Sequence, residues 1–96
     1  MKTLEKVKKI LAERKEDIRK KYGVIILGVF GSIVKGQQKE TSDVDILIEI
    51  EKPIGFAFFE LWDELEKLLG CKVDLVRHSL IREEIKENIL HEVVEI

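Results

Sequence analysis

Cysteine, proline and long apolar runs are all scarce in this chain of 96 residues. No apolar run approaches the roughly 20 residues that a membrane-spanning helix needs, and the first residues do not resemble a secretion signal. The single cysteine, Cys71, excludes an internal disulfide, and we expect it to pack as a small apolar group. These absences favour a cytoplasmic protein that has no membrane partner.

Aromatic residues are also few, at 6% of the chain. Residues 1–22 contain nine Lys and Arg against four acids, whereas the whole chain has a net charge of −2. Such a basic segment could contact nucleic acid, but it lacks the interleaved aromatic side chains of many nucleic-acid binders. We therefore interpret its charges as the solvated face of an amphipathic helix, and we expect no polynucleotide partner.

The apolar pattern predicts one α/β (α+β) domain over residues 1–96, with a mixed central sheet of three to four strands flanked by helices. At 45% hydrophobic and 38% charged residues, the chain has the composition of a globular domain with one core. Period-3.6 and β-branched patterns place the elements. We expect helices at 3–21, at 55–69 and from Ser79, strands at 24–30, 43–50 and 71–77, a loop at 31–42, and a short strand or apolar tail at 91–96.

The first two predicted strands are joined by a polar stretch whose ends carry reactive groups. Gly31 and Ser32 follow the first strand, where a backbone without a side chain can approach a ligand closely. Asp43 and Asp45 begin the second strand and lie on the same face, because side chains two apart on a strand point the same way. Two neighbouring carboxylates repel each other, and a divalent cation such as Mg²⁺ relieves that conflict.

Each part of this stretch also has an ordinary structural interpretation. Gly-Ser after a strand is commonly a turn, and Ser-Asp-x-Asp is commonly a capping device. However, Asp45 lies between Val44 and Ile46 in an apolar strand, where a carboxylate needs a partner or a metal. The loop lacks the glycine and lysine pattern of a P-loop, which argues against an ordinary NTPase.

The residues Gly31-Ser32, Gly36 and Ser42-Asp43-x-Asp45 together resemble the nucleotidyltransferase superfamily typified by DNA polymerase β. The whole chain is most similar to its minimal members, the MntA-type partners of HEPN-domain toxins. The resemblance implies that Asp43, Asp45 and Asp74 are catalytic and bind two Mg²⁺ ions. It also implies that ATP is the substrate and that its phosphates are bound by Gly31, Ser32, Lys35, Gly36 and Ser42.

The position of Asp74 supports this interpretation from the sequence itself. A crossover helix between the second and third strands would place both in one sheet, so that Asp74 stands near Asp45. The flanking Arg77 and Arg82 could contact phosphate, although salt bridges are the simpler expectation. Lys35 stands where many relatives carry arginine, and lysine keeps the charge but not the two-pronged geometry.

The acceptor of the nucleotide is not fixed by these residues. The resemblance implies adenylylation of a HEPN-type toxin, on a tyrosine hydroxyl, by a protein that acts as its antitoxin. The alternative is a non-catalytic antitoxin or nucleotide-sensing module that neutralises its partner by contact. Whether the chain forms homo- or hetero-oligomers is left open, and a small-molecule acceptor is disfavoured because no acceptor domain is present.

Overall fold

The computed structural model describes residues 3–36 and 43–96. In chain order the elements are α1 (Leu4–Tyr22), β1 (Val24–Phe30), α2 (Ser32–Lys35), β2 (Val44–Ile50), α3 (Ala57–Leu69), β3 (Val73–Arg77), the short 3₁₀ helix η1 (His78–Leu80), α4 (Glu83–Glu92) and β4 (Val94–Glu95). The strands form one sheet in the order β3-β2-β1-β4. β1 is antiparallel to β2 and β4, and β2 is parallel to β3, so the predicted mixed sheet is confirmed.

Helix α1 begins and ends as its sequence predicts. The Thr3 hydroxyl accepts a hydrogen bond from the Lys6 backbone N–H and so caps the first turn. Gly23 ends the helix in a left-handed conformation with φ of 72°, a geometry that favours glycine. The basic residues of α1 lie on its exposed side, whereas Val7, Leu11 and Ile18 are buried.

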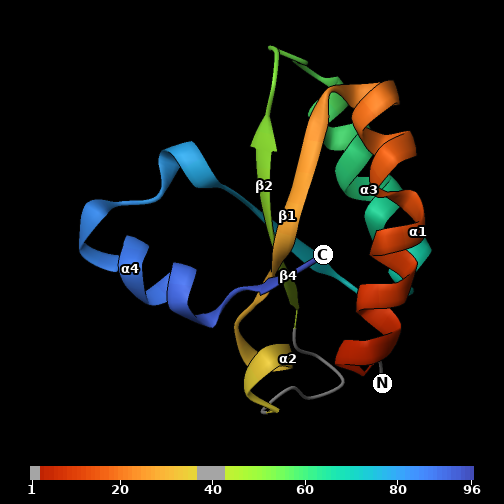
Figure 1. Ribbon diagram of the computed structural model, residues 1–96. Helices are drawn as coiled ribbons and strands as arrows, with labels where there is room; N and C mark the ends of the chain where they lie inside the picture. Colours follow the sequence, from red (N-terminus) through yellow and green to blue (C-terminus); the bar gives the residue numbers. More distant parts are fainter. Residues whose placement is uncertain (1–2, 37–42) are drawn as a thin grey trace.

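The core lies between the sheet and the two long helices, which cover the same face of the sheet (Figure 1). Helix α3 contributes Leu61, Leu65 and Leu69, all fully buried, and β2 contributes Ile46 and Ile48. Burying each such side chain contributes about 1.5–3 kcal/mol relative to leaving it exposed. Of the aromatic residues of α3, Phe58 and Trp62 pack against the core, whereas Phe59 is 64% exposed.

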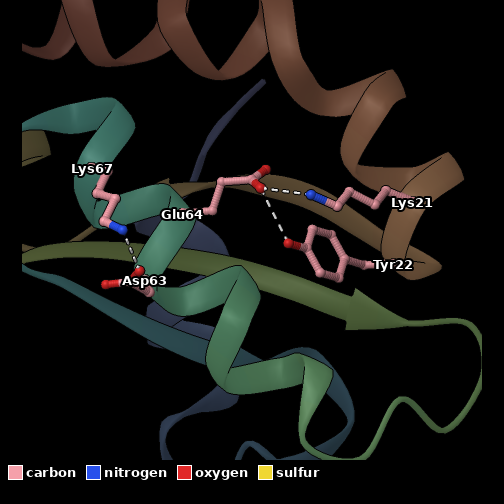
Figure 2. Close-up of polar contacts among 5 residues, drawn as sticks. All are labelled: Lys21, Tyr22, Asp63, Glu64 and Lys67. Carbon is pink, nitrogen blue, oxygen red and sulfur yellow. Dashed lines mark hydrogen bonds and ion pairs between the residues drawn. The ribbon is translucent and has the colours of Figure 1, made fainter.

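Polar contacts join α1 to α3 at the edge of this core (Figure 2). The Tyr22 hydroxyl donates a hydrogen bond of 3.1 Å to Glu64 Oε1, and Lys21 Nζ lies 3.1 Å from the same oxygen. Tyr22 is 5% exposed and belongs to the core, so its ring is a packing group. Next to this contact, Lys67 and Asp63 form an exposed ion pair along α3.

The opposite face of the sheet is covered less completely. Alternate residues of β1, Ile25 and Leu27, are only partly buried, so β1 is covered more completely on the face that meets the long helices. Helix α4 lies on this side, standing away from the sheet, and it contains no buried residue (Figure 1). No helix of the described chain has both the length and the apolar character needed to cross a membrane.

The chain between β1 and β2 and the chain after β3 differ from expectation. Residues 32–35 form the short helix α2 where a loop was predicted. The helix predicted from Ser79 begins later: Ser79 lies in η1, and extended backbone at Ile81 and Arg82 delays α4 until Glu83. The prediction was wrong there because η1 follows β3 directly and takes up residues 78–80. The predicted short strand near the C-terminus is present as β4.

Candidate active site

Asp45 and Asp74 are neighbours on adjacent strands. The parallel pairing of β2 with β3 places them directly opposite each other, and neighbouring strands lie about 4.8 Å apart. Residues paired in this way point to the same face of a sheet. The expectation that Asp74 stands beside Asp45 is therefore confirmed. Asp43 lies one residue before β2 and is exposed.

Asp45 sits among other carboxylates. The pKa of its carboxyl group is raised to about 6, mostly by burial and then, in decreasing order, by the negative charges of Asp74, Asp43 and Glu92. Each of these influences opposes ionisation of Asp45. The arrangement stores electrostatic repulsion that a bound cation would relieve.

Gly31 brings the end of β1 against this group. Its φ of 81° lies in the region that side chains rarely adopt, and a Cβ at this position would collide with Asp45 Oδ2. The pairing of Phe30 with Asp45 across β1 and β2 produces this close approach. Only glycine fits at residue 31, and its backbone is thereby held next to the carboxylates.

The remaining residues predicted to bind nucleotide lie in or beside α2, except Ser42, which is outside the described residues. Ser32 begins α2 and is partly exposed. Gly36 ends α2 in a left-handed conformation, with its N–H bonded to the Ser32 carbonyl. The left-handed end of α2 is thus enough to explain a glycine at residue 36. Contact between Gly36 and a nucleotide stays a prediction.

Lys35 has a partner that the sequence did not reveal. Its Nζ lies 2.9 Å from Glu92 Oε1, and the same Glu92 acts on the pKa of Asp45. Glu92 belongs to the last turn of α4, and the pairing of β4 with β1 brings it there. No spacing in the sequence indicates that Glu92 lies near the site, because the contact depends on the pairing of β4 with β1.

The two arginines near β3 do not join the site. Arg77 is three residues after Asp74, so it lies further along β3 on the other face, where it pairs with Ile48 of β2. Neither Arg77 nor Arg82 forms an ion pair with another described residue. The salt bridges expected for them are therefore not found in the described chain.

The donor groups fit magnesium in type. Carboxylate oxygens are the ligands that Mg²⁺ prefers, and repulsion around Asp45 favours a cation there. Within residues 3–36 and 43–96, however, no three His, Cys, Asp or Glu side chains converge closely enough to hold a metal ion by themselves. Mg²⁺ normally completes its shell with water and substrate phosphate, so such a preformed cage is not required.

Comparisons with known proteins agree with this geometry. The family model "Polymerase beta, Nucleotidyltransferase" matches residues 5–96. The chain is 47% identical over 95 residues to the protein adenylyltransferase MntA of Thermococcus cleftensis, covering 98% of this chain and 96% of that protein. It is 46% identical over 82 residues to a protein of Methanocaldococcus jannaschii, covering 84% of this chain and 95% of that protein.

Two solved structures share the fold. One, described as a minimal nucleotidyltransferase, superposes with a TM-score of 0.74 at 28% identity and covers 94% of this chain and 95% of that chain. The other, a toxin-antitoxin crystallised with AMP-PNP, has a TM-score of 0.64 at 23% identity and covers 93% of this chain and 68% of that chain. The family model and the identity to MntA, together with the paired acids, show that the chain belongs to the polymerase β nucleotidyltransferase family and is an enzyme of that class.

Proposed function

We propose that this enzyme transfers AMP from ATP to a hydroxyl group of a partner protein, with Mg²⁺ as cofactor. The observation that carries the proposal is the pairing of Asp45 with Asp74 beside Gly31. The similarity to a protein named as a protein adenylyltransferase supports AMP as the transferred group. The structural neighbour crystallised with AMP-PNP has the same fold, which supports a nucleotide site of this shape.

In the proposed reaction the acceptor oxygen attacks the α-phosphorus of ATP, and the bond from that phosphorus to the bridging oxygen breaks. Pyrophosphate leaves with the bond electrons, and the hydroxyl proton passes to a carboxylate, a role that we assign to Asp74. Asp43, Asp45 and Asp74 would hold two Mg²⁺ ions. Bound Mg²⁺ supplies positive charge to the phosphates and lowers the pKa of the acceptor hydroxyl.

Phosphate oxygens are bound by hydrogen-bond donors and positive charges, and this chain has a few near the acids. The Gly31 backbone lies beside Asp45 at the end of β1, and Ser32 follows it as the first residue of α2; we assign the binding of phosphate oxygens to this backbone and to the Ser32 hydroxyl. Lys35 adds a positive charge on the same short helix, provided that it leaves Glu92. We assign nucleotide contacts to Gly36 as well, and to Ser42 from its place in the sequence motif alone.

The acceptor that we propose is a tyrosine of a HEPN-type toxin, so that this enzyme is the antitoxin. Two considerations support a protein acceptor. The relative from Thermococcus cleftensis is named as a protein adenylyltransferase, and a structural neighbour is a toxin-antitoxin. ATP and such a toxin would be met in the cytoplasm, where we place the reaction.

The test is to incubate the protein with ATP, Mg²⁺ and a HEPN-type toxin from the same organism and to measure the intact mass of the toxin. We expect a gain of one or more AMP groups that disappears with EDTA. The double variant Asp43→Asn with Asp45→Asn should lose the transfer and still bind the toxin. A toxin whose mass never changes, under conditions where it binds, would contradict the proposal.

The second candidate function is neutralisation of the toxin by contact, without chemistry. The ion pair between Lys35 and Glu92 favours it, because the ammonium group that would bind phosphate is already paired with a carboxylate. Under this alternative the double Asp variant protects cells from the toxin as well as the wild type does. Under the enzymatic proposal that protection is lost.

A further inference from the structure

An open groove lies at the far end of β2 and β3 from the acids. It encloses about 850 Å³ between α3, the end of β3 and the connection from β2 to α3. We call it the edge groove; its lining includes Phe58, Phe59, Trp62, Leu75, Arg77 and Leu80. Ile50, at this end of β2, is five residues from Asp45, or about 16 Å along the strand. The groove is therefore separate from the proposed active site.

Aromatic side chains of α3 form one wall of the groove. Phe58 packs edge-to-face against both Phe59 and Trp62, with ring centroids 5.9 and 5.6 Å apart. Phe59 remains 64% exposed, and Leu80 on the opposite side is 69% exposed. Large apolar side chains that gather around a concavity and stay in contact with water are typical of protein interaction sites.

The groove runs along the free edge of the sheet. β3 is the last strand on its side of the sheet. On its outer edge, the side chains of α3 form hydrogen bonds with the backbone of Val73: its N–H donates to Glu66, and its carbonyl accepts from Trp62 Nε1. Residues two apart on a strand present their N–H and C=O groups to the same edge. Leu75 and Arg77 thus direct theirs outward, and no described residue pairs with that part of the edge.

Arg77 supplies a charge that lacks a partner. Its Nε is buried, and among the described residues nothing accepts a hydrogen bond from it. An unsatisfied buried donor is costly, and for a guanidinium a carboxylate is the strongest acceptor. The nearby acid Glu51 is already paired with Arg19, by two hydrogen bonds of 2.8 and 3.1 Å. The groove therefore offers apolar contacts, a free strand edge and, besides Lys52, the guanidinium of Arg77, whose buried Nε has no acceptor among the described residues.

We propose that the edge groove binds an extended segment of the partner protein, which adds as a strand to β3 and carries both apolar side chains and a carboxylate. The main chain of the segment would pair with Leu75 and Arg77, its apolar side chains would contact Phe59, and its carboxylate would bind Arg77. Strand addition of this kind takes affinity from main-chain bonds and specificity from side-chain pockets. The binding of an extended acidic segment does not depend on the proposed function. The further statement that this segment belongs to the protein that accepts AMP rests on the proposed function.

A second copy of the chain fits this groove less well. If two β3 edges paired about a two-fold axis perpendicular to the sheet, the residues on the side of Arg77 would be Val73, Leu75 and Arg77 itself. None of these is an acid, so the guanidinium would stay unpaired. Charge complementarity thus favours a partner that brings its own carboxylate.

The first experiment titrates ¹⁵N-labelled protein, without nucleotide or Mg²⁺, with the capped peptide Val-Thr-Glu-Thr-Ile up to millimolar concentration, because its Val, Glu and Ile side chains lie on one face of a strand. We expect saturable shifts at the Leu75 and Arg77 amides and at the Trp62 indole. The peptide with Gln in place of Glu, and the variant Arg77→Gln, should each bind about tenfold more weakly, the loss of one charge-assisted hydrogen bond. The variant Leu90→Ser, altered at an exposed apolar residue of α4, is the matched control and should bind normally.

Three results would overturn the proposal: no shifts at the highest peptide concentration, shifts centred away from β3, or equal affinity for the Glu and Gln peptides. Shifts of β3 that depend on protein concentration without peptide would assign the groove to a second copy, which also overturns it. Folding of each variant is checked by circular dichroism. Phe59→Ser is the second groove variant, and its exposed position makes misfolding improbable as an explanation.

The second experiment joins the groove to the reaction. Phe59→Ser and Arg77→Gln should raise the KM for the HEPN-type toxin about tenfold while leaving kcat and ATP binding unchanged. If the toxin is modified with an unchanged KM, docking of the acceptor in the groove is wrong although the proposed function stands. If the wild type modifies no toxin, the proposed function fails, and the peptide titration still decides whether the groove binds an extended acidic segment.

Discussion

Lys35 of α2 and Glu92 of α4 form an ion pair with 2.9 Å between Nζ and Oε1. The pair joins the two segments that flank Asp45, and its members are half-exposed and partly buried, respectively. Lys35 therefore faces an acid in the structure. Triphosphate would offer it a stronger acceptor, so we expect the pair to open when ATP binds.

The first prediction concerns this exchange. Glu92→Gln should tighten ATP binding about fivefold, because Lys35 no longer has to leave a carboxylate, whereas Lys35→Ala should weaken it by a similar factor. Stability should change by less than about 1 kcal/mol, as is usual for an exposed pair. Calorimetric titration with ATP measures the affinities, with Glu84→Gln in the first turn of α4 as control. Weaker Mg²⁺ binding in Glu92→Gln would instead make Glu92 a ligand.

The second prediction concerns pH. The pKa of Asp45 is raised to about 6 by burial and by its acidic neighbours. Protonated Asp45 thus favours the folded state, a contribution that is complete below about pH 4, the ordinary pKa of the unfolded chain, and is lost as the pH rises through about 6. In EDTA the melting temperature should fall between pH 5 and pH 8. Asp45→Asn should flatten that decline, measured by thermal melts followed by circular dichroism.

Mg²⁺ should oppose the fall in melting temperature with rising pH, because it binds the same carboxylate that loses its proton. A cation binds the ionised carboxylate and competes with the proton, so Mg²⁺ should raise the melting temperature more at pH 7.5 than at pH 5. Equal stabilisation at both pH values would show that the ion binds elsewhere.

The third prediction compares two glycines with positive φ. Gly31→Ala should abolish nucleotidyl transfer and destabilise the fold by about 1–3 kcal/mol, because its Cβ would collide with Asp45 in a strained conformation. Gly36→Ala has a φ of 70° but meets nothing within 4 Å, so only the backbone strain of about 1 kcal/mol applies. Urea unfolding and the mass assay measure the two effects. Equal loss of stability would contradict the predicted clash.

The fourth prediction concerns the seam between α1 and α3 shown in Figure 2. Tyr22→Phe removes the hydrogen bond from a buried hydroxyl to Glu64 and should cost about 1 kcal/mol of unfolding free energy. Lys67→Met removes an exposed pair with Asp63 from the same helix and should have no measurable effect. Urea denaturation distinguishes them, and transfer activity should be unchanged in both.

Much of the fold follows from local patterns. The buried stripe of α1, the unbroken apolar run of β1 and the glycine stops after α1 and α3 are short-range signals, and the elements lie close to where those signals place them. The neighbouring positions of Asp45 and Asp74 were also predictable, because a helix of this length between two strands favours a parallel crossover.

The parts that could not be predicted depend on contacts between distant segments. Helix α2 has only four residues, too few to show a period. Glu92 reaches the site because β4 pairs with β1 at Gly28, where a Cβ would meet the Val94 carbonyl at 2.5 Å. In the sequence, Gly28 is only an interruption of an apolar run. The reason for a glycine there is its close contact with β4, which the sequence does not reveal.

The parallel pairing of Asp45 with Asp74 also ties catalytic competence to complete folding. The hairpin of β1 and β2 is formed by residues close in sequence, whereas Asp74 reaches Asp45 only through the pairing of β3 with β2. A chain with the hairpin alone would hold Asp43 and Asp45 but not Asp74. We therefore expect the proposed chemistry to require the completed sheet, not the hairpin by itself.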